Sequence, residues 1–298
     1  MRDILYVGLF YSFKFLIWLL PDVVVRVFVK SLARFVFYVD KKHKHIAQVN
    51  LDLAYEDTLT QEEKQVIIKA TYEHLLLMLV DFVKNQGISQ EKLLQKVTFR
   101  NDERIKKALA EGEKVILLTA HYGNWELLPL ALAAKYAPLS AVGRKLDSSV
   151  MDGILQKNRE QFHIEMIEKK GAMREMIGVL KNNRMLGLLV DQNTSENEGI
   201  LVDFFGKPVR HTPAAAILAR RFNAIIFPVY IRTLSSKIHE ITFYEPIYTQ
   251  KTTDNEEDIR DSVQKQAKIT EEVIRQQPQE WFWLHKRWKN QFEERYNV

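Results

Sequence analysis

From residue 97 onward, short apolar runs alternate with longer amphipathic segments, and this alternation constrains the fold more than any other feature of the sequence. Apolar runs occupy 115–120, 139–143, 185–190 and 224–231, and helical patterns occupy 103–111, 125–135, 148–162, 172–182 and 213–222. Alternating strands and helices predict a parallel sheet with helices packed on its faces. Residues 237–247 alternate like an edge strand, and 253–276 predict a long polar helix. The expected fold class is therefore α/β, with a mostly parallel central sheet flanked by helices.

The sequence before residue 97 predicts helices. Between 43 and 87, apolar residues recur at helical spacing, and Thr60 with Glu63 has the sequence signature of a capping box at a helix start. Gly87 is expected to end this region. A helical amino-terminal portion therefore precedes the sheet.

Two apolar runs at the amino terminus predict attachment to a membrane. Residues 4–21 are almost wholly apolar, close to the roughly 17–25 residues that a spanning helix needs. In 23–39, basic residues recur every four positions, at Arg26, Lys30 and Arg34. On a helix they form a basic stripe beside an apolar face, which is typical of a helix that lies in a membrane surface. The alternative is that both runs are core helices of a soluble protein.

Composition limits the further choices. A chain of 298 residues is long enough for one large domain or two small ones, and we expect a membrane-anchoring helical part at 1–40 and a single α/β domain at 41–298. The formal net charge of +5 suits anionic lipid, an acidic carrier protein or nucleic acid, and does not choose among them. The sequence has no cysteine, which excludes disulfides, Cys-based zinc sites and a Cys nucleophile.

A polar cluster, TAHYGNWELL at 119–128, follows directly on an apolar run. In open α/β sheets, ligands bind at the carboxyl ends of the strands, where His121 is expected to lie. Gly123 permits a tight turn, and Asn124 as a helix N-cap would place Glu126 in the first helical turn, near enough to hold the imidazole. A histidine oriented by a carboxylate is the arrangement of a general base. The alternative is that His121 and Glu126 merely cap and complement the helix, and spacing alone leaves both interpretations open.

Several segments in order resemble the late (secondary) acyltransferases of lipid A biosynthesis. They are AHYGNWE at 120–126, GR at 143–144, NR at 158–159, LLVDQN at 188–193 and the long stretch 199–232. The wider family includes related bacterial acyltransferases that acylate mannosyl lipids. The similarity runs from about residue 40 to the carboxyl end, and a hydrophobic amino-terminal helix is also a family trait.

The resemblance implies a mechanism that needs no cofactor. His121 would take the proton of an acceptor hydroxyl, Glu126 would orient His121, and the oxygen would attack the thioester of an acyl carrier protein, the co-substrate. Arg144 and Arg159 would bind phosphate groups of a phosphorylated glycolipid acceptor or of the carrier's phosphopantetheine arm. Asp191 would position the histidine or an arginine. The alternatives are solvated surface arginines and a strand-terminal cap.

The implied location is the cytoplasmic face of a bacterial inner membrane, where the amino terminus contacts membrane lipids. Phe204 and Phe205 could wall an acyl channel or fill the core. Aromatic residues and cations near the carboxyl end suit either a membrane interface or the packing of a terminal segment; they are Trp281, Trp283, His285, Lys286, Arg287 and Trp288.

Other function classes have weaker support. No nucleic-acid-binding fold accompanies the basic tail, and the histidines lack paired metal-ligand spacing. The nucleophile-elbow, dinucleotide and phosphate-loop motifs are missing. The remaining alternatives are an acyltransferase with another lipid acceptor, such as a glycerophospholipid or a mannosyl lipid, and a catalytically silent lipid-binding protein.

Overall fold

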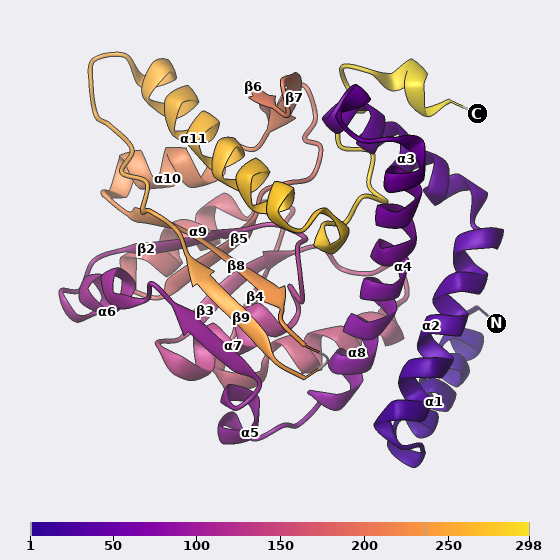
Figure 1. The fold of residues 1–298 in the computed structure, drawn as a ribbon. Coiled ribbons are helices and arrows are strands. Elements are labelled where there is room, and N and C mark those ends of the chain that lie inside the picture. Colours follow the sequence, from indigo (N-terminus) through magenta and orange to yellow (C-terminus); the bar gives the residue numbers. More distant parts are fainter. Residues whose placement is uncertain (1, 236, 298) are drawn as a thin grey trace.

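The computed structural model describes residues 2–235 and 237–297, which form a central sheet flanked by helices (Figure 1). The strands are β1 Val97–Arg100, β2 Val115–Thr119, β3 Leu139–Gly143, β4 Glu165–Glu168, β5 Met185–Leu189, β6 Ile200–Phe204, β7 Lys207–His211, β8 Ile225–Thr233 and β9 His239–Phe243. The helices are α1 Arg2–Leu19, α2 Asp22–Val39, α3 Lys41–Tyr55, α4 Gln61–Lys84, α5 Gln90–Leu94, α6 Glu103–Ala110, α7 Leu127–Lys135, α8 Ser149–Arg159, α9 Met173–Lys181, α10 Ala214–Phe222 and α11 Asn255–Gln276. Helices α1–α4 lie together on one side of the molecule (Figure 1).

Seven strands of the described chain form the central sheet, in the order β1-β9-β8-β2-β5-β3-β4. Neighbouring strands are parallel except for β8 and β9, which confirms the mostly parallel sheet expected from the sequence. The strand β2 is wholly buried between β5 and β8. Because β2, β3, β4, β5 and β8 run the same way, their carboxyl ends meet at one sheet edge, together with the amino ends of β1 and β9. Ligands of open α/β sheets bind at such an edge.

Three strand assignments differ from the sequence prediction. The strand within 237–247 is not an edge, because β9 lies between β8 and β1. The edges are β1 and β4, which at four residues each are too short to show a clear period. Strands β6 and β7 form a separate antiparallel hairpin with positive φ at both turn residues, Phe205 and Gly206. The sequence hides this turn, because Asn or Asp before Gly is its usual signal.

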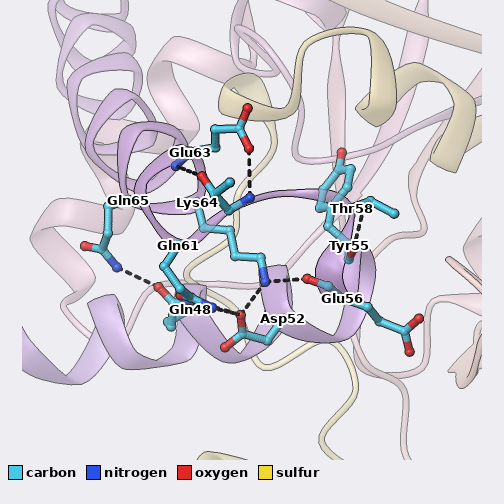
Figure 2. A network of polar contacts seen from close by, with 10 residues as sticks. Gln48, Asp52, Tyr55, Glu56, Thr58, Gln61, Glu63, Lys64 and Gln65 are labelled. Carbon is cyan, nitrogen blue, oxygen red and sulfur yellow. Dashed lines mark hydrogen bonds and ion pairs between the residues drawn. The ribbon is translucent and has the colours of Figure 1, made fainter.

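The turn between α3 and α4 is held by the predicted capping box and by a buried lysine (Figure 2). The Glu63 N–H donates to Thr60 Oγ1 at 3.2 Å, and the Thr60 N–H donates to the Glu63 carboxylate at 2.8 Å. Lys64, which is buried, donates to Asp52 Oδ1 at 2.8 Å and to the Glu56 carbonyl at 2.7 Å. These bonds join the end of α3 to the first turn of α4.

Helix α2 packs one apolar face on α4 and leaves another exposed. Val25, Val29, Ala33 and Phe37 are its buried residues. Many large apolar side chains of α1 and α2 are exposed, including Ile4, Leu5, Leu9, Phe15, Trp18, Leu19, Val23, Val27, Phe28, Phe35 and Tyr38. Within residues 2–235 and 237–297, no helix combines the length and the apolar character that crossing a bilayer requires.

The aromatic residues near the carboxyl end are buried. Trp281, Trp283 and Trp288 are at most 2% exposed, and their rings contact those of Phe204 and Phe205 in the β6–β7 hairpin. Burial this complete excludes contact of the three indoles with a membrane interface and agrees with the packing alternative. The two phenylalanines fill the same aromatic core.

The terminal segment 280–283 runs beside the loop that follows β2. The Phe282 N–H donates to the His121 carbonyl at 2.9 Å, and the Gly123 N–H donates to the Glu280 carbonyl at 3.0 Å. Gly123 has a φ of +57°, and a Cβ there would lie 1.7 Å from the Ile231 carbonyl oxygen. Glycine is therefore required at this turn, as the sequence suggested. Strand β8 and the terminal segment together fix the backbone of the His121 loop.

The carboxyl group of Glu280 is buried in this contact region. Its oxygens accept from the Thr233 N–H at 3.0 and 3.1 Å. Burial raises the pKa of Glu280 to about 7, and the Thr233 bond and Arg232 oppose the rise only in part. Because this pKa lies above the ordinary value of 4.5, protonation of Glu280 stabilises the fold. That contribution is complete below about pH 4.5 and is lost as the pH rises through about 7.

We expect Glu280→Gln to remove this pH dependence, because the amide stays neutral. Between about pH 4.5 and 7, the free energy of unfolding should fall more steeply in the wild type than in Glu280→Gln. Urea unfolding at a series of pH values measures both slopes, and Glu256→Gln, at an exposed position on α11, is the control. Equal slopes for the wild type and Glu280→Gln would contradict this assignment.

Candidate active site

His121 lies at the carboxyl end of β2, at the sheet edge where the sequence placed it. Its side chain is 22% exposed, so the ring is sheltered but accessible from solvent. Asn124 Oδ1 accepts from the Leu127 N–H at 3.1 Å, but the helix begins two residues later than expected, since α7 starts at Leu127 and Glu126, not Asn124, holds the N-cap position. Asn124 Nδ2 also donates to Asp81 of α4 at 3.0 Å. The histidine loop is therefore tied both to α7 and to α4.

Asp191 is the carboxylate that holds the imidazole. It follows β5, the strand next to β2, and is 3% exposed. His121 Nδ1 lies 2.8 Å from Asp191 Oδ1, and the His121 backbone N–H donates to Oδ2 at 3.0 Å. The Trp281 indole N–H donates to the same Oδ2 at 2.8 Å. One buried carboxylate thus joins β2, β5 and the terminal segment.

The electrostatics of Asp191 fix the tautomer of His121. Burial alone would raise the pKa of Asp191, but the imidazole and the donated hydrogen bonds outweigh it and hold that pKa well below its usual range. The carboxylate is therefore ionised at neutral pH and accepts a hydrogen bond from the protonated Nδ1 of His121. In the neutral imidazole, the lone pair then lies on Nε2, the nitrogen that a general base uses.

The surroundings of the imidazole are aromatic and amide groups. Gln192 Nε2 lies 3.4 Å from His121 Nε2. The Trp125 ring meets the imidazole edge-on at 5.5 Å between centroids, and the Phe282 ring lies 6.2 Å away. Trp125, for which the sequence suggested no role, therefore helps to confine the imidazole.

Glu126 binds an arginine, and the expected Glu126–His121 contact is replaced by the Asp191–His121 contact. Arg159 Nε and Nη2 donate to the two Glu126 oxygens at 2.9 and 2.5 Å, a bidentate pair. Their side chains are only 20% and 12% exposed. The difference arises because α7 begins after Glu126, and Arg159 at the end of α8 satisfies both carboxylate oxygens. The structure thus brings together two separate pairs, His121–Asp191 and Glu126–Arg159.

Arg144 lies apart from both pairs. It follows β3 at the same sheet edge, and its side chain is 80% exposed. Its Nη2 lies 3.4 Å from Asp147, an exposed pair of the kind that contributes little to stability. The guanidinium is accessible to a ligand, and Arg159 is largely taken up by Glu126.

Arg287, which the sequence placed only in an aromatic and basic tail, supports the site from behind. It is fully buried, and its Nη1 donates to the Gln192 carbonyl at 3.0 Å and to the Arg210 carbonyl at 2.7 Å. Nη2 lies 2.9 Å from Nδ1 of buried His211, whose pKa burial lowers to about 3. A neutral His211 can accept this bond. Arg287 therefore fixes the backbone that carries Asp191 and Gln192. The only sign of this role in the sequence is the mixed basic and aromatic run HKRW at 285–288.

This arrangement is suited to moving a proton at Nε2 of His121. The ionised Asp191 would stabilise the imidazolium that forms when Nε2 takes a proton. The described site contains the carboxylate–histidine half of a hydrolytic triad, and the proton donor would have to come from a substrate group such as a hydroxyl.

Comparisons with known proteins show which proteins this chain is similar to. The lipid A biosynthesis acyltransferase of Haemophilus influenzae is 23% identical over 64% of this chain and 60% of its own. The phosphatidylinositol mannoside acyltransferase of Mycobacterium tuberculosis is 27% identical over 43% of this chain and 42% of its own. The lipid A biosynthesis palmitoleoyltransferase of Escherichia coli is 21% identical over 84% of this chain and 79% of its own. The chain spans less than two thirds of the length of the first two relatives.

A solved structure also aligns with the chain. The 1-acyl-sn-glycerophosphate (LPA) acyltransferase PlsC from Thermotoga maritima covers 94% of this chain and 99% of its own, at 15% identity and a TM-score of 0.38. A score this low carries no argument about function. The family model described as bacterial lipid A biosynthesis acyltransferase, by contrast, matches residues 3–290. Since this match covers nearly the whole chain, the protein belongs to the bacterial lipid A biosynthesis acyltransferase family.

Proposed function

We propose that this protein is an O-acyltransferase that moves a fatty acyl chain from acyl carrier protein to a hydroxyl of a lipid A precursor. The observation that carries the proposal is the contact of His121 with buried, ionised Asp191, which leaves Nε2 as a base at the sheet edge. Family membership supports acyl transfer and a glycolipid acceptor.

In the proposed reaction, Nε2 of His121 takes the proton of the acceptor hydroxyl. The oxygen attacks the thioester carbonyl, the carbon–sulfur bond breaks, and the imidazolium returns its proton to the departing thiolate. Asp191 stabilises the imidazolium between these steps. No acyl group is attached to the protein, in keeping with a sequence that has no cysteine.

Glu126, Arg159 and Arg144 take supporting roles in the proposal. Glu126 fixes the Arg159 guanidinium at the wall of the site through a bidentate pair. The exposed Arg144 binds a phosphate group of the acceptor or of the carrier's pantetheine arm, as a guanidinium does well.

His121→Ala and Asp191→Asn test the carboxylate–histidine pair. His121→Ala should lower kcat by at least about 100-fold, the low end for loss of a general acid–base catalyst. Asp191→Asn should lower it by about 100- to 10,000-fold, because the amide neither fixes the tautomer nor stabilises the imidazolium. Transfer of a labelled acyl chain from acyl carrier protein measures both, and Asp57→Asn, at an exposed position away from the site, is the control.

Glu126→Gln distinguishes the two carboxylates in the same assay. A loss below about tenfold in Asp191→Asn, together with a loss above about 100-fold in Glu126→Gln, would return the orienting role to Glu126.

A second candidate acceptor is a glycerophospholipid or a mannosyl lipid. The similarity to a phosphatidylinositol mannoside acyltransferase favours including it. Initial rates with a panel of the three acceptor classes decide between them. If purified, folded protein acylates none of the three acceptor classes from acyl carrier protein, the result would favour a catalytically silent lipid-binding protein.

We also propose that α1 and α2 lie in the surface of a bacterial inner membrane, on its cytoplasmic side. Exposed apolar side chains on both helices support this, because monomeric soluble proteins rarely expose large contiguous apolar surfaces. Basic residues on α2 would contact anionic headgroups. The acyl acceptor would then be within the same surface.

Substitution of exposed residues on α1 tests this attachment without removing buried contacts. Leu5→Gln, Leu9→Gln and Trp18→Gln together should weaken binding to phospholipid vesicles at least about tenfold, since each apolar side chain contributes roughly 1.5–3 kcal/mol when buried. Vesicle co-sedimentation measures the change. The matched control is Val66→Gln, Leu201→Gln and Leu234→Gln, three exposed apolar positions elsewhere. Equal binding by the two triple variants would place the attachment outside α1.

A further inference from the structure

A cavity lies at the same sheet edge as His121. Its volume is about 590 Å³, and it is lined by α2, α4, α5 and the turn between β8 and β9. Asn124, three residues after His121, is part of its wall. Because β8 ends and β9 begins at the edge that carries His121, this α2–α4 pocket lies beside the candidate active site.

The α2–α4 pocket is rich in cations. Six basic side chains line it, namely Arg26, Lys30, Lys84, Lys92, Lys96 and Lys237, against three carboxylates, Asp22, Glu73 and Asp81. The lining therefore carries three positive charges in excess. These basic residues come from four separate segments, so the fold and not one charged run assembles the cluster.

Two details show that the positive charge is incompletely balanced. Lys84 and Lys237 share one carboxylate, Asp22, at 2.5 and 2.8 Å, and together they hold the pKa of Asp22 well below its usual range. Lys96 donates to the neutral amide oxygen of Asn85 at 2.6 Å, and burial lowers the pKa of its ammonium. A doubly shared carboxylate and a part-buried lysine on a neutral amide both favour an additional anion.

A buried histidine adds an available polar atom. His239 is 4% exposed and lines the α2–α4 pocket, with Nε2 lying 3.2 Å from Asp81. Within the described chain, its Nδ1 is buried without a hydrogen-bond partner. Buried polar atoms in folded proteins nearly always have a partner, so this nitrogen is available to a bound group or to water.

The apolar part of the lining narrows the ligand class. Val25, Leu77, Met78, Val80 and Ile238 lie among the cations. Helix α2, which forms one wall, also carries the exposed apolar side chains proposed to contact lipid. A ligand with a phosphate group and an apolar body matches both parts of this lining.

We propose that the α2–α4 pocket binds the phosphate group of a lipid and so holds a phosphorylated acceptor with its hydroxyl at His121. Naming the acceptor rests on the proposed function, whereas binding of a lipid phosphate does not. This site is separate from Arg144 and Arg159, which lie toward β3 and β4 on the other side of His121.

Equilibrium binding tests the proposal without turnover. The full chain is mixed with neutral detergent micelles that contain an acylated, bis-phosphorylated glucosamine disaccharide, its dephosphorylated form, or phosphatidylglycerol. The wild type should bind the bis-phosphorylated lipid about tenfold more tightly than the dephosphorylated one, since hydrogen bonds to charged groups are stronger than neutral ones.

Charge reversal in the pocket should abolish that preference. The pocket variant is Lys92→Glu with Lys237→Glu, two exposed lysines in the lining, and thermal unfolding verifies its fold. The matched control is Lys107→Glu with Lys251→Glu, exposed lysines outside the pocket with the same change of charge. The control should keep the tenfold preference.

Comparing the lipids in this experiment identifies which kind of lipid supplies the phosphate. Preference for the disaccharide phosphates over phosphatidylglycerol supports the acceptor, and equal, variant-sensitive binding of phosphatidylglycerol supports a phosphate site filled by bulk lipid. Identical binding by the pocket variant and the control variant would overturn the site itself. Loss of acyl transfer with an intact binding preference would instead count against the proposed reaction, so the two failures are distinguishable.

Discussion

The hydrogen bonds to the buried carboxylate of Asp191 organise this molecule. A carboxylate at 3% exposure is costly unless it is paired, and here the imidazole, a backbone N–H and an indole N–H satisfy it. Two of these donors belong to His121, after β2, and the third belongs to Trp281 in the terminal segment, so correct packing of β2 against β5 and of the terminal segment against both is a condition for the site. The fold and the orientation of His121 therefore depend on the same group.

The terminal segment explains how a loop can hold a base in one orientation. Its backbone bonds to His121 and Gly123, while Trp281 reaches Asp191 and Arg287 reaches the Gln192 carbonyl. The aromatic core beneath it, formed with Phe204 and Phe205, keeps this segment in place. Functional groups held by packed neighbours keep a defined geometry, which general base catalysis requires.

Local patterns predicted what depends on local physics. Hydrophobic periodicity predicted the strand before His121 and the helix after it, and residue type predicted the capping box at Thr60 and the turn at Gly123, because each is decided within a few residues. The side chains that bind His121 and Glu126 could not be predicted in this way, because strand order decides which distant residues lie beside them. Asp191 is 70 residues from His121, and Arg159 is 33 from Glu126.

The His-x4-Glu spacing favoured a pair between His121 and Glu126 because only local spacing is visible in the sequence. In the structure, the pairing of β2 with β5 brings the Asp191 carboxylate to the imidazole instead. The tail at Trp281–Trp288 also could not be assigned from its composition. Aromatic and basic residues occur both at membrane interfaces and in cores, and only the position of Asp191 and of the β6–β7 hairpin decides between them.

We infer that Asp191 fixes His121 with its proton on Nδ1 and its lone pair on Nε2. Nitrogen-15 NMR of histidine-labelled protein at neutral pH tests this directly, with His121 identified by the signals lost in His121→Ala. We expect a protonated Nδ1 and an unprotonated Nε2 for the neutral ring. A neutral His121 protonated on Nε2 would contradict it, because the proposed base would then have no lone pair to offer.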